Sequence, residues 1–259
     1  MANIKLLGRL IISCDIHAVT GLHIGGNGAA LEIGGQDNPV IRHAINRQPY
    51  IPGSSLRGKM RSQLEKKLGS KQNQKVGKAT IHVCKDADAV NPCPVCKIFG
   101  LSAADKGGSP TRLIVRDVAM TPESVSVLMT AHTDQLFTET KSENAIDRVT
   151  SAAAPRNIER VPSETVFGPA EMVFSLYEDE DVELFGTLLD CFQLVEDDYL
   201  GGGGSRGNGK VRFESIKIQG RPSDDYSHPV LLGEYKDLQA FEADLKALKQ
   251  KIRDQIVKG

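Results

Sequence analysis

The chain has 259 residues, 40% of them hydrophobic, so it can bury a sizeable core as one large domain or two small ones. No apolar stretch is long enough to cross a bilayer, and Arg9 and Asp15 interrupt the N-terminal segment, so we expect a cytoplasmic protein with no membrane partner. The 32 Lys and Arg balance 33 Asp and Glu, which argues against an evenly basic nucleic-acid binder. Residues 57–67 and 148–160 nevertheless lean basic, so the neutral total can hide a basic groove.

Residues 4–19 mix alternating and continuous apolar positions, which predicts a long first strand. The segments TGLHIGG (20–26) and EIGGQDNPVIR (32–42) follow, and their glycine pairs predict a turning, exposed loop. Asp37 lies in this loop. On the residues alone, Asp37 is first of all a turn residue, because Asp-Asn-Pro suits a turn.

A helix is predicted after Pro52 and Gly53, with its apolar stripe at Leu56, Met60, Leu64 and Leu68. Ser54 or Ser55 can cap it. Its first turns also carry Arg57, Lys59 and Arg61 beside free backbone N–H groups, a combination that favours an anion site. The alternative is a solvated basic face.

Four soft ligands crowd into HVCKDADAVNPCPVCKIFG: His82, Cys84, Cys93 and Cys96. Three thiolates and one imidazole suit tetrahedral Zn²⁺ and leave no open coordination position, so the predicted site is structural. A redox pair of Cys93 and Cys96 is the alternative, but no thioredoxin-like unit surrounds it. The two other cysteines, Cys14 and Cys191, are predicted core residues.

Residues 138–162 carry Lys141, Arg148, Arg156 and Arg160 among small residues, with few large apolar side chains to bury. This composition predicts an extended arm that could lie along a phosphate backbone. A solvated loop is the alternative.

The sequence GGGGSRGNGK (201–210) nearly matches a nucleotide-binding P-loop, but Val211 stands where such a loop needs Ser or Thr. The apolar spacing predicts a helix over 182–195 before the loop and a strand over 211–218 after it, the reverse of the P-loop order. With Arg206 and Lys210, the loop suits a longer phosphate backbone. A flexible linker is the alternative.

The element order predicts an α+β fold of the ferredoxin-like or RNA-recognition type with insertions, although base-stacking aromatic residues are missing. An amphipathic helix is predicted over 238–256. We expect one such domain over 1–221, with a zinc-binding insertion near 76–100 and an arm near 130–165, and a C-terminal helical extension over 222–259.

Seven segments in order, TGLHIGG, IGGQDNPVIR, IPGSSLRGKMR, CPVCKIFG, TETKSENAIDR, PRNIERVP and GGGGSRGNGK, resemble the RAMP superfamily of CRISPR proteins. More narrowly, they resemble the backbone subunit of the type III-A (Csm) effector complex. That resemblance implies a RAMP fold with a thumb-like β-arm. It also implies a chain that polymerises along CRISPR RNA with other Csm subunits and copies of itself, and that cuts complementary single-stranded target RNA at regular intervals.

The resemblance gives Asp37 the role required for cutting, in which a ribose 2′-OH attacks the adjacent phosphate and a divalent ion, Mg²⁺ or Mn²⁺, is needed. Because an isolated Asp has a pKa of ~3.9 it is a poor base, so in-line geometry and charge neutralisation must supply much of the rate. Together the family match and the basic segments predict these RNA-binding residues: His23, Ser54, Ser55, Arg57, Lys59, Arg61, Lys141, Asn144, Arg148, Arg156, Arg160, Gly202, Gly203, Ser205, Arg206 and Lys210.

Three rival functions stay open at the level of sequence. A purely structural RAMP subunit would coat the guide RNA without cutting. A guide-processing endonuclease of the same superfamily could use His17, His23 or His43 as an acid or base. A zinc-stabilised module could bind a protein partner, in which case association would not depend on phosphate.

Overall fold

The computed structural model describes residues 4–26, 38–77, 79–85, 87–90, 92–101 and 110–258, without the side chains of residues 87 and 88. Asp37 therefore lies outside the described residues. So does the part of its loop that precedes it, residues 27–36.

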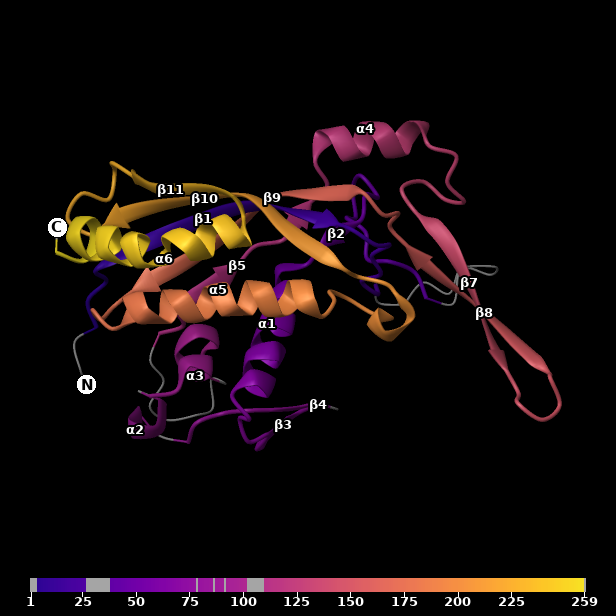
Figure 1. Ribbon diagram of the computed structural model, residues 1–259, viewed down its shortest axis with the longest axis horizontal. Helices are drawn as coiled ribbons and strands as arrows, with labels where there is room; N and C mark the ends of the chain where they lie inside the picture. The colour runs from indigo at the N-terminus through magenta and orange to yellow at the C-terminus, as the bar shows by residue number, and fades with distance from the viewer. Residues whose placement is uncertain are drawn as a thin grey trace.

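A five-stranded antiparallel sheet in the order β11-β10-β1-β9-β5 forms the centre of the molecule (Figure 1). Its strands are β1 (Gly8–Ala18), β5 (Leu113–Val115), β9 (Thr165–Leu176), β10 (Val211–Pro222) and β11 (Val230–Asp237). Side chains of β1 alternate strictly between buried and half-buried, because one sheet face packs on the core and the other does not. The sheet confirms the predicted α+β fold.

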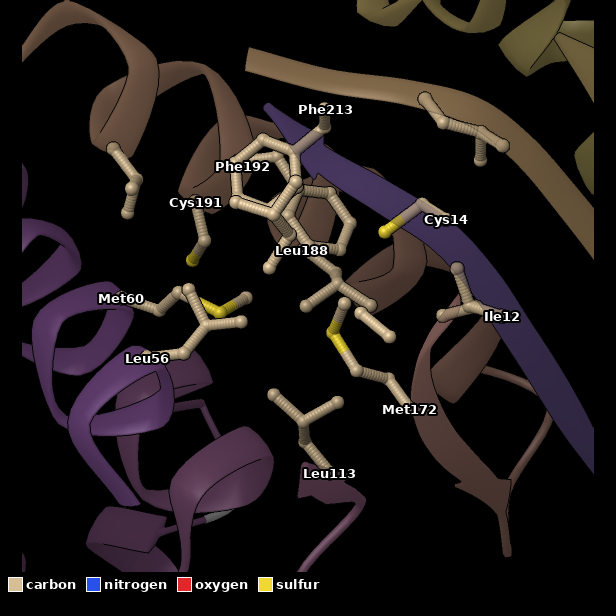
Figure 2. Close-up of a cluster of buried hydrophobic side chains, with 14 of the residues drawn as sticks. Ile12, Cys14, Leu56, Met60, Leu113, Met172, Leu188, Cys191, Phe192 and Phe213 are labelled. Carbon is tan, nitrogen blue, oxygen red and sulfur yellow. The ribbon is translucent and has the colours of Figure 1, made fainter. Parts of the chain in front are cut away.

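Helices α1 (Gly53–Lys67), α5 (Asp181–Asp197) and α6 (Leu238–Ile252) cover the buried face of the sheet, and α6 continues into a π-helical turn, η2 (Arg253–Val257). The predicted stripe of α1 is buried at Leu56, Met60 and Leu64, whereas Leu68 is exposed beyond the end of the helix. Figure 2 shows α1, α5, β1 and β9 meeting in one apolar cluster. Cys14 and Cys191 both lie in that cluster, as predicted.

Small elements connect these parts. They are β2 (Tyr50–Ile51), β3 (Gln74–Val76), β4 (Ala79–Ile81), α2 (Ala87–Val90), α3 (Pro94–Phe99), β6 (Val118–Ala119) and α4 (Pro122–Thr130). The segments β3 to α3 lie together beside α1, whereas α4 lies on the other side of the sheet (Figure 1).

The predicted arm is a β-hairpin of β7 (Glu139–Ile146) and β8 (Ala153–Arg160), which projects away from the body of the molecule (Figure 1). Its base is tied to the body by paired backbone hydrogen bonds between Leu22 and Val161. We call this hairpin the thumb.

Two expectations need correction. Neither Ser54 nor Ser55 caps α1; Asp117 does so from another element, because its Oδ1 accepts the Gly53 N–H at 2.7 Å. Residues 222–259 hold more than a helix, since β11 extends the central sheet before α6 begins. The sequence pattern does not predict β11, because the buried and exposed positions of this strand alternate irregularly around Gly233.

Candidate nucleic-acid interface and metal centre

The glycine segment 201–210 is a folded loop that contains a short 3₁₀ turn, η1 (Gly204–Arg206). Gly201, Gly203, Gly207 and Gly209 have left-handed backbone angles, which glycine adopts without strain. A Cβ atom on Gly209 would lie 2.1 Å from the carbonyl oxygen of Leu200. The structure therefore excludes the flexible-linker alternative, because the left-handed backbone angles, and the close packing at Gly209, favour glycine at these positions.

His23 joins the glycine loop to the thumb. Its carbonyl oxygen accepts the Gly202 N–H at 2.7 Å. Its Nδ1 lies 2.6 Å from the carbonyl oxygen of Glu159, and since a carbonyl only accepts, Nδ1 carries the proton. Nε2 of a neutral His23 then holds a lone pair.

A cavity of about 250 Å³ lies between the thumb and the glycine loop. Two guanidinium groups, an imidazole and backbone amides border it, which is a set of groups that binds anions. Its lining residues are His23, Asn38, Arg156, Ile158, Gly202, Gly203 and Arg206. Asn38 directly follows Asp37 in the sequence.

The structure brings three of the predicted cations together and separates others from them. Lys141, Arg156 and Arg206 gather around Glu143 of the thumb, at N to O distances of 2.9 to 3.4 Å. Arg160 instead lies against Gly21, with its Nε 2.7 Å from Glu139 and its Nη1 2.9 Å from Asn208 Oδ1.

The cations of α1 face the protein. Lys59 lies 2.7 Å from Asp198 and 3.5 Å from the centre of the Tyr199 ring. Arg57 donates to the carbonyl of Phe99, and Arg61 donates to the carbonyls of His82 and Gly100. Because Asp117 already occupies the positive end of α1, the N–H of Gly53 is not free for an external anion. The RNA-binding roles of these residues stay predictions.

The remaining predicted positions are accessible. Asn144 and Arg148 are exposed towards the tip of the thumb, where Asp147 accepts the N–H groups of Val149 and Thr150. Those bonds, with the Thr150 hydroxyl, hold the pKa of Asp147 below its usual range, so the turn stays charged. Ser54, Ser205 and Lys210 are exposed, and Ser55 is half-buried.

Sequence reasoning missed Glu159, a buried carboxylate at the base of the thumb. It accepts hydrogen bonds from Arg42 and Thr138, both at 2.6 Å, and from the backbone N–H of Val40 at 2.8 Å. Glu159 thus fixes the chain just after Asp37 to the thumb. No local pattern could reveal this, since Val40 and Arg42 lie more than a hundred residues away in the sequence.

His82, Cys84, Cys93 and Cys96 do converge, and their ligand atoms all lie within 4.8 Å of one another. His82 Nδ1 lies 3.0 Å from the carbonyl oxygen of Lys71, to which it donates, so Nε2 faces the sulfur atoms with its lone pair. Hydrogen bonding, chiefly with Cys96, lowers the pKa of Cys93 to about 4 despite desolvation. This cluster could hold a metal ion.

Arg57 and Arg61 bind carbonyl oxygens at both ends of the metal-site segment, so they attach it to α1. The sequence gives no sign of this structural role and predicts an anion site for both side chains. The described residues contain no further group of three or more His, Cys, Asp or Glu side chains placed to hold a metal ion.

No helix among the described residues has the length and apolar character needed to cross a membrane.

An antiparallel sheet that carries a folded glycine loop and a projecting thumb defines the class of protein. Residues 15–212 match the model of the RAMP superfamily. A crystal structure of a Csm3–Csm4 subcomplex of the type III-A CRISPR-Cas interference complex is similar, with a TM-score of 0.60, 29% identity and coverage of 94% of this chain and 98% of that one. The crystal structure of Methanopyrus kandleri Csm3 shares the fold, with a TM-score of 0.64 at 20% identity.

Two curated relatives are both described as the CRISPR system Cms endoribonuclease Csm3. The protein from Methanocaldococcus jannaschii is 42% identical over 229 residues, which cover 87% of each chain. That from Streptococcus thermophilus is 38% identical over 216 residues, covering 81% of this chain and 89% of the relative. The chain belongs to the RAMP superfamily and, within it, to the Csm3 endoribonucleases.

Proposed function

We propose that this chain is a backbone subunit of a type III-A CRISPR effector complex. It binds CRISPR RNA, polymerises along it with further copies of itself and other Csm subunits, and cleaves complementary single-stranded target RNA at regular intervals. The cavity between the thumb and the glycine loop, which we call the groove, carries the proposal, because two guanidinium groups line it together with Asn38, the residue that follows Asp37 in the sequence. Membership of the Csm3 endoribonucleases supports the cleavage itself.

Within that groove, the glycine loop offers backbone amides, and Arg156 and Arg206 offer guanidinium groups, to phosphates of the guide RNA. His23 keeps the loop and the thumb in register. These contacts position RNA without reading its sequence, as a subunit that must accept any guide requires. Arg148 and Asn144 lie on the exposed thumb, where they can reach the paired target.

Cleavage proceeds by attack of a ribose 2′-oxygen on the adjacent phosphorus. The 2′-OH loses its proton, the bond to the 5′-oxygen breaks, and that oxygen gains a proton. The products carry a 2′,3′-cyclic phosphate and a 5′-OH. Asp37 orients the 2′-OH, and the cations of the groove offset the charge that builds up on phosphate. A bound Mg²⁺ or Mn²⁺ would add positive charge at the same phosphate.

The metal centre is structural and takes Zn²⁺. Three thiolates and an imidazole supply four soft protein ligands, so no position is left for a reactive water. The ion would hold together the segment that Arg57 and Arg61 attach to α1. Purified protein should contain about one zinc per chain by elemental analysis.

The test is to purify the chain with its complex and add a labelled RNA complementary to the guide. We expect co-purified RNA of one defined length, and target fragments that differ by a constant interval and end in a 2′,3′-cyclic phosphate. A complex that binds the target and never cuts it would leave only the guide-coating role. Cutting of repeat RNA by the isolated chain would indicate guide processing instead.

A further inference from the structure

Glu143 is an acidic side chain in the middle of the predicted RNA-binding cations. The β7–β8 register sets it opposite Arg156, and strand alternation sets it on the same face as Lys141. Its carboxylate oxygens lie 2.9 Å from Arg206 Nε, 3.1 Å from Arg156 Nη2 and 3.4 Å from Lys141 Nζ. Three cations, two from the thumb and one from the glycine loop, thus converge on one carboxylate.

This carboxylate is enclosed although it lies on an exposed hairpin. The Glu143 side chain keeps only 10% of its accessible surface, whereas that of Arg156 keeps 51%. Neither of its oxygens accepts a hydrogen bond of normal geometry from the part of the chain that the structure describes. Charge attraction therefore holds it in place, without the directed bonds that fix Glu159 at the thumb base.

The contacts around Glu143 close the thumb onto the glycine loop. Arg206 belongs to η1 and reaches Glu143 on β7, and Lys141 of β7 donates to the carbonyl oxygen of Arg206 at 2.6 Å. Arg156 and Arg206 also line the cavity beside His23. The same two guanidinium groups thus face an internal anion on one side and the proposed phosphate site on the other.

We propose that Glu143 is an internal competitor of RNA phosphate, which fastens the thumb to the glycine loop in the RNA-free chain and is displaced when RNA binds. This inference rests on the proposed function of the groove. A carboxylate and a phosphodiester each carry one negative charge, so the exchange leaves the cations neutralised at every stage. Phosphate gains because it can also accept from the backbone N–H of Gly203, which borders the cavity, whereas the N–H of Gly202 is already donated to His23.

The competition makes the isolated chain a weak binder of single RNA strands. Glu143→Gln keeps the shape of the side chain and removes its charge, so Arg156, Arg206 and Lys141 become available to RNA. We expect the variant to bind RNA about three- to tenfold more tightly, the range for loss of one nearby charge close to a protein surface. Its affinity should also fall more steeply with added salt, because more phosphates are neutralised on binding.

The experiment measures binding of a fluorescein-labelled single-stranded RNA of mixed sequence to the full chain, by anisotropy at several salt concentrations. Glu234→Gln is the matched control: Glu234 lies on β11 in an exposed ion pair with Lys217 of β10, so the substitution removes the same charge away from the groove. Tighter binding and a steeper salt slope in Glu143→Gln alone would support the competition. Equal or weaker binding in Glu143→Gln would overturn it and leave the proposed function intact. Failure of the unmodified chain to bind RNA, alone or with its complex, would instead reject the proposed function.

Discussion

At the scale of single residues, Gly53 shows how close packing dictates a residue type. It is the first residue of α1, and a Cβ atom there would lie 2.3 Å from the carbonyl oxygen of Val115. Gly58 lies in the same helix, and apart from the adjacent backbone of that helix no atom of the described residues lies within 4 Å of the position that its Cβ would take. A side chain would therefore clash at position 53, whereas position 58 has room for one.

We predict opposite effects of alanine at these two positions. Gly53→Ala should lower the free energy of unfolding by about 1 to 3 kcal/mol, because the added Cβ would clash with the backbone of β5 and neither β5 nor α1 can move apart without strain. Gly58→Ala should raise it by about 0.5 to 1 kcal/mol, since alanine restricts the unfolded chain and favours a helix. Urea unfolding of both variants measures this, and equal effects of both substitutions would contradict the packing argument.

The cysteines also differ residue by residue. Hydrogen bonds lower the pKa of Cys93 to about 4, whereas burial, and then the charge of Asp15, raises the pKa of Cys14 to about 12. Cys93 is thus a thiolate at neutral pH, whereas Cys14 stays a protonated thiol there.

After removal of metal with a chelator, we predict that iodoacetamide modifies Cys93 first, at a rate nearly constant between about pH 6 and 8. Cys14 and Cys191 should react only after denaturation, because both are buried. Peptide mass spectrometry identifies the modified sites. A Cys93 rate that rises about tenfold per pH unit would mean an ordinary thiol.

At the scale of elements, the structure of the glycine loop differs most from what its sequence suggests. The sequence nearly matches a P-loop and is also compatible with a flexible linker. In the structure the loop is a turn packed against His23 and Leu200. Local residue types predict a helix before it and a strand after it, and both are present as α5 and β10.

Alanine substitutions within this loop should separate the contribution of backbone strain to stability from the contribution of close packing. Gly207 and Gly209 both have φ of +83°, but only the Cβ of Gly209 would meet another residue. Gly207→Ala should cost about 1 kcal/mol of stability from left-handed strain alone. Gly209→Ala should cost about 1 to 3 kcal/mol more and weaken RNA binding. Thermal unfolding and RNA anisotropy check both, and equal behaviour of the two variants would mean that the loop is loosely packed.

Elements with a clear local period could be predicted from sequence, and those defined by distant partners could not. The stripe at Leu56, Met60 and Leu64 predicts α1, and His82 with its cysteines predicts a metal cluster from spacing alone. The cap on α1 comes from Asp117, 64 residues away, so the nearby serines misled the prediction. The role of Glu159 could not be predicted for the same reason, because its partners Val40 and Arg42 are distant in the sequence.

At the scale of the whole molecule, β11 and α6 belong to the core. Figure 1 shows α6 lying along the sheet beside α5, and Phe241 contacts Phe185 with ring centres 5.9 Å apart. Leu238, Phe241, Leu248, Ile252 and Ile256 are all buried. The C-terminal segment lies outside the match to the RAMP superfamily, which ends at residue 212, yet it completes the sheet.

A chain truncated after Pro222 should therefore fail to fold cooperatively. Burial of five large apolar side chains contributes on the order of 10 kcal/mol, similar to the ~5 to 15 kcal/mol by which a whole domain is stable. We expect loss of the sharp thermal transition and strong binding of a hydrophobic dye. A truncated chain that melts sharply near the temperature of the full chain would show that the segment is a detachable extension.

For the whole assembly, we propose that the groove holds RNA while Asp37 directs the cut. The most direct measurement follows a labelled complementary RNA in complexes built with the unmodified chain, with Asp37→Ala, or with Asp225→Ala, an exposed acid in the turn before β11. We predict that all three complexes bind guide and target alike, and that only Asp37→Ala abolishes the regularly spaced products. Undiminished cutting by the Asp37→Ala complex would contradict this role of Asp37.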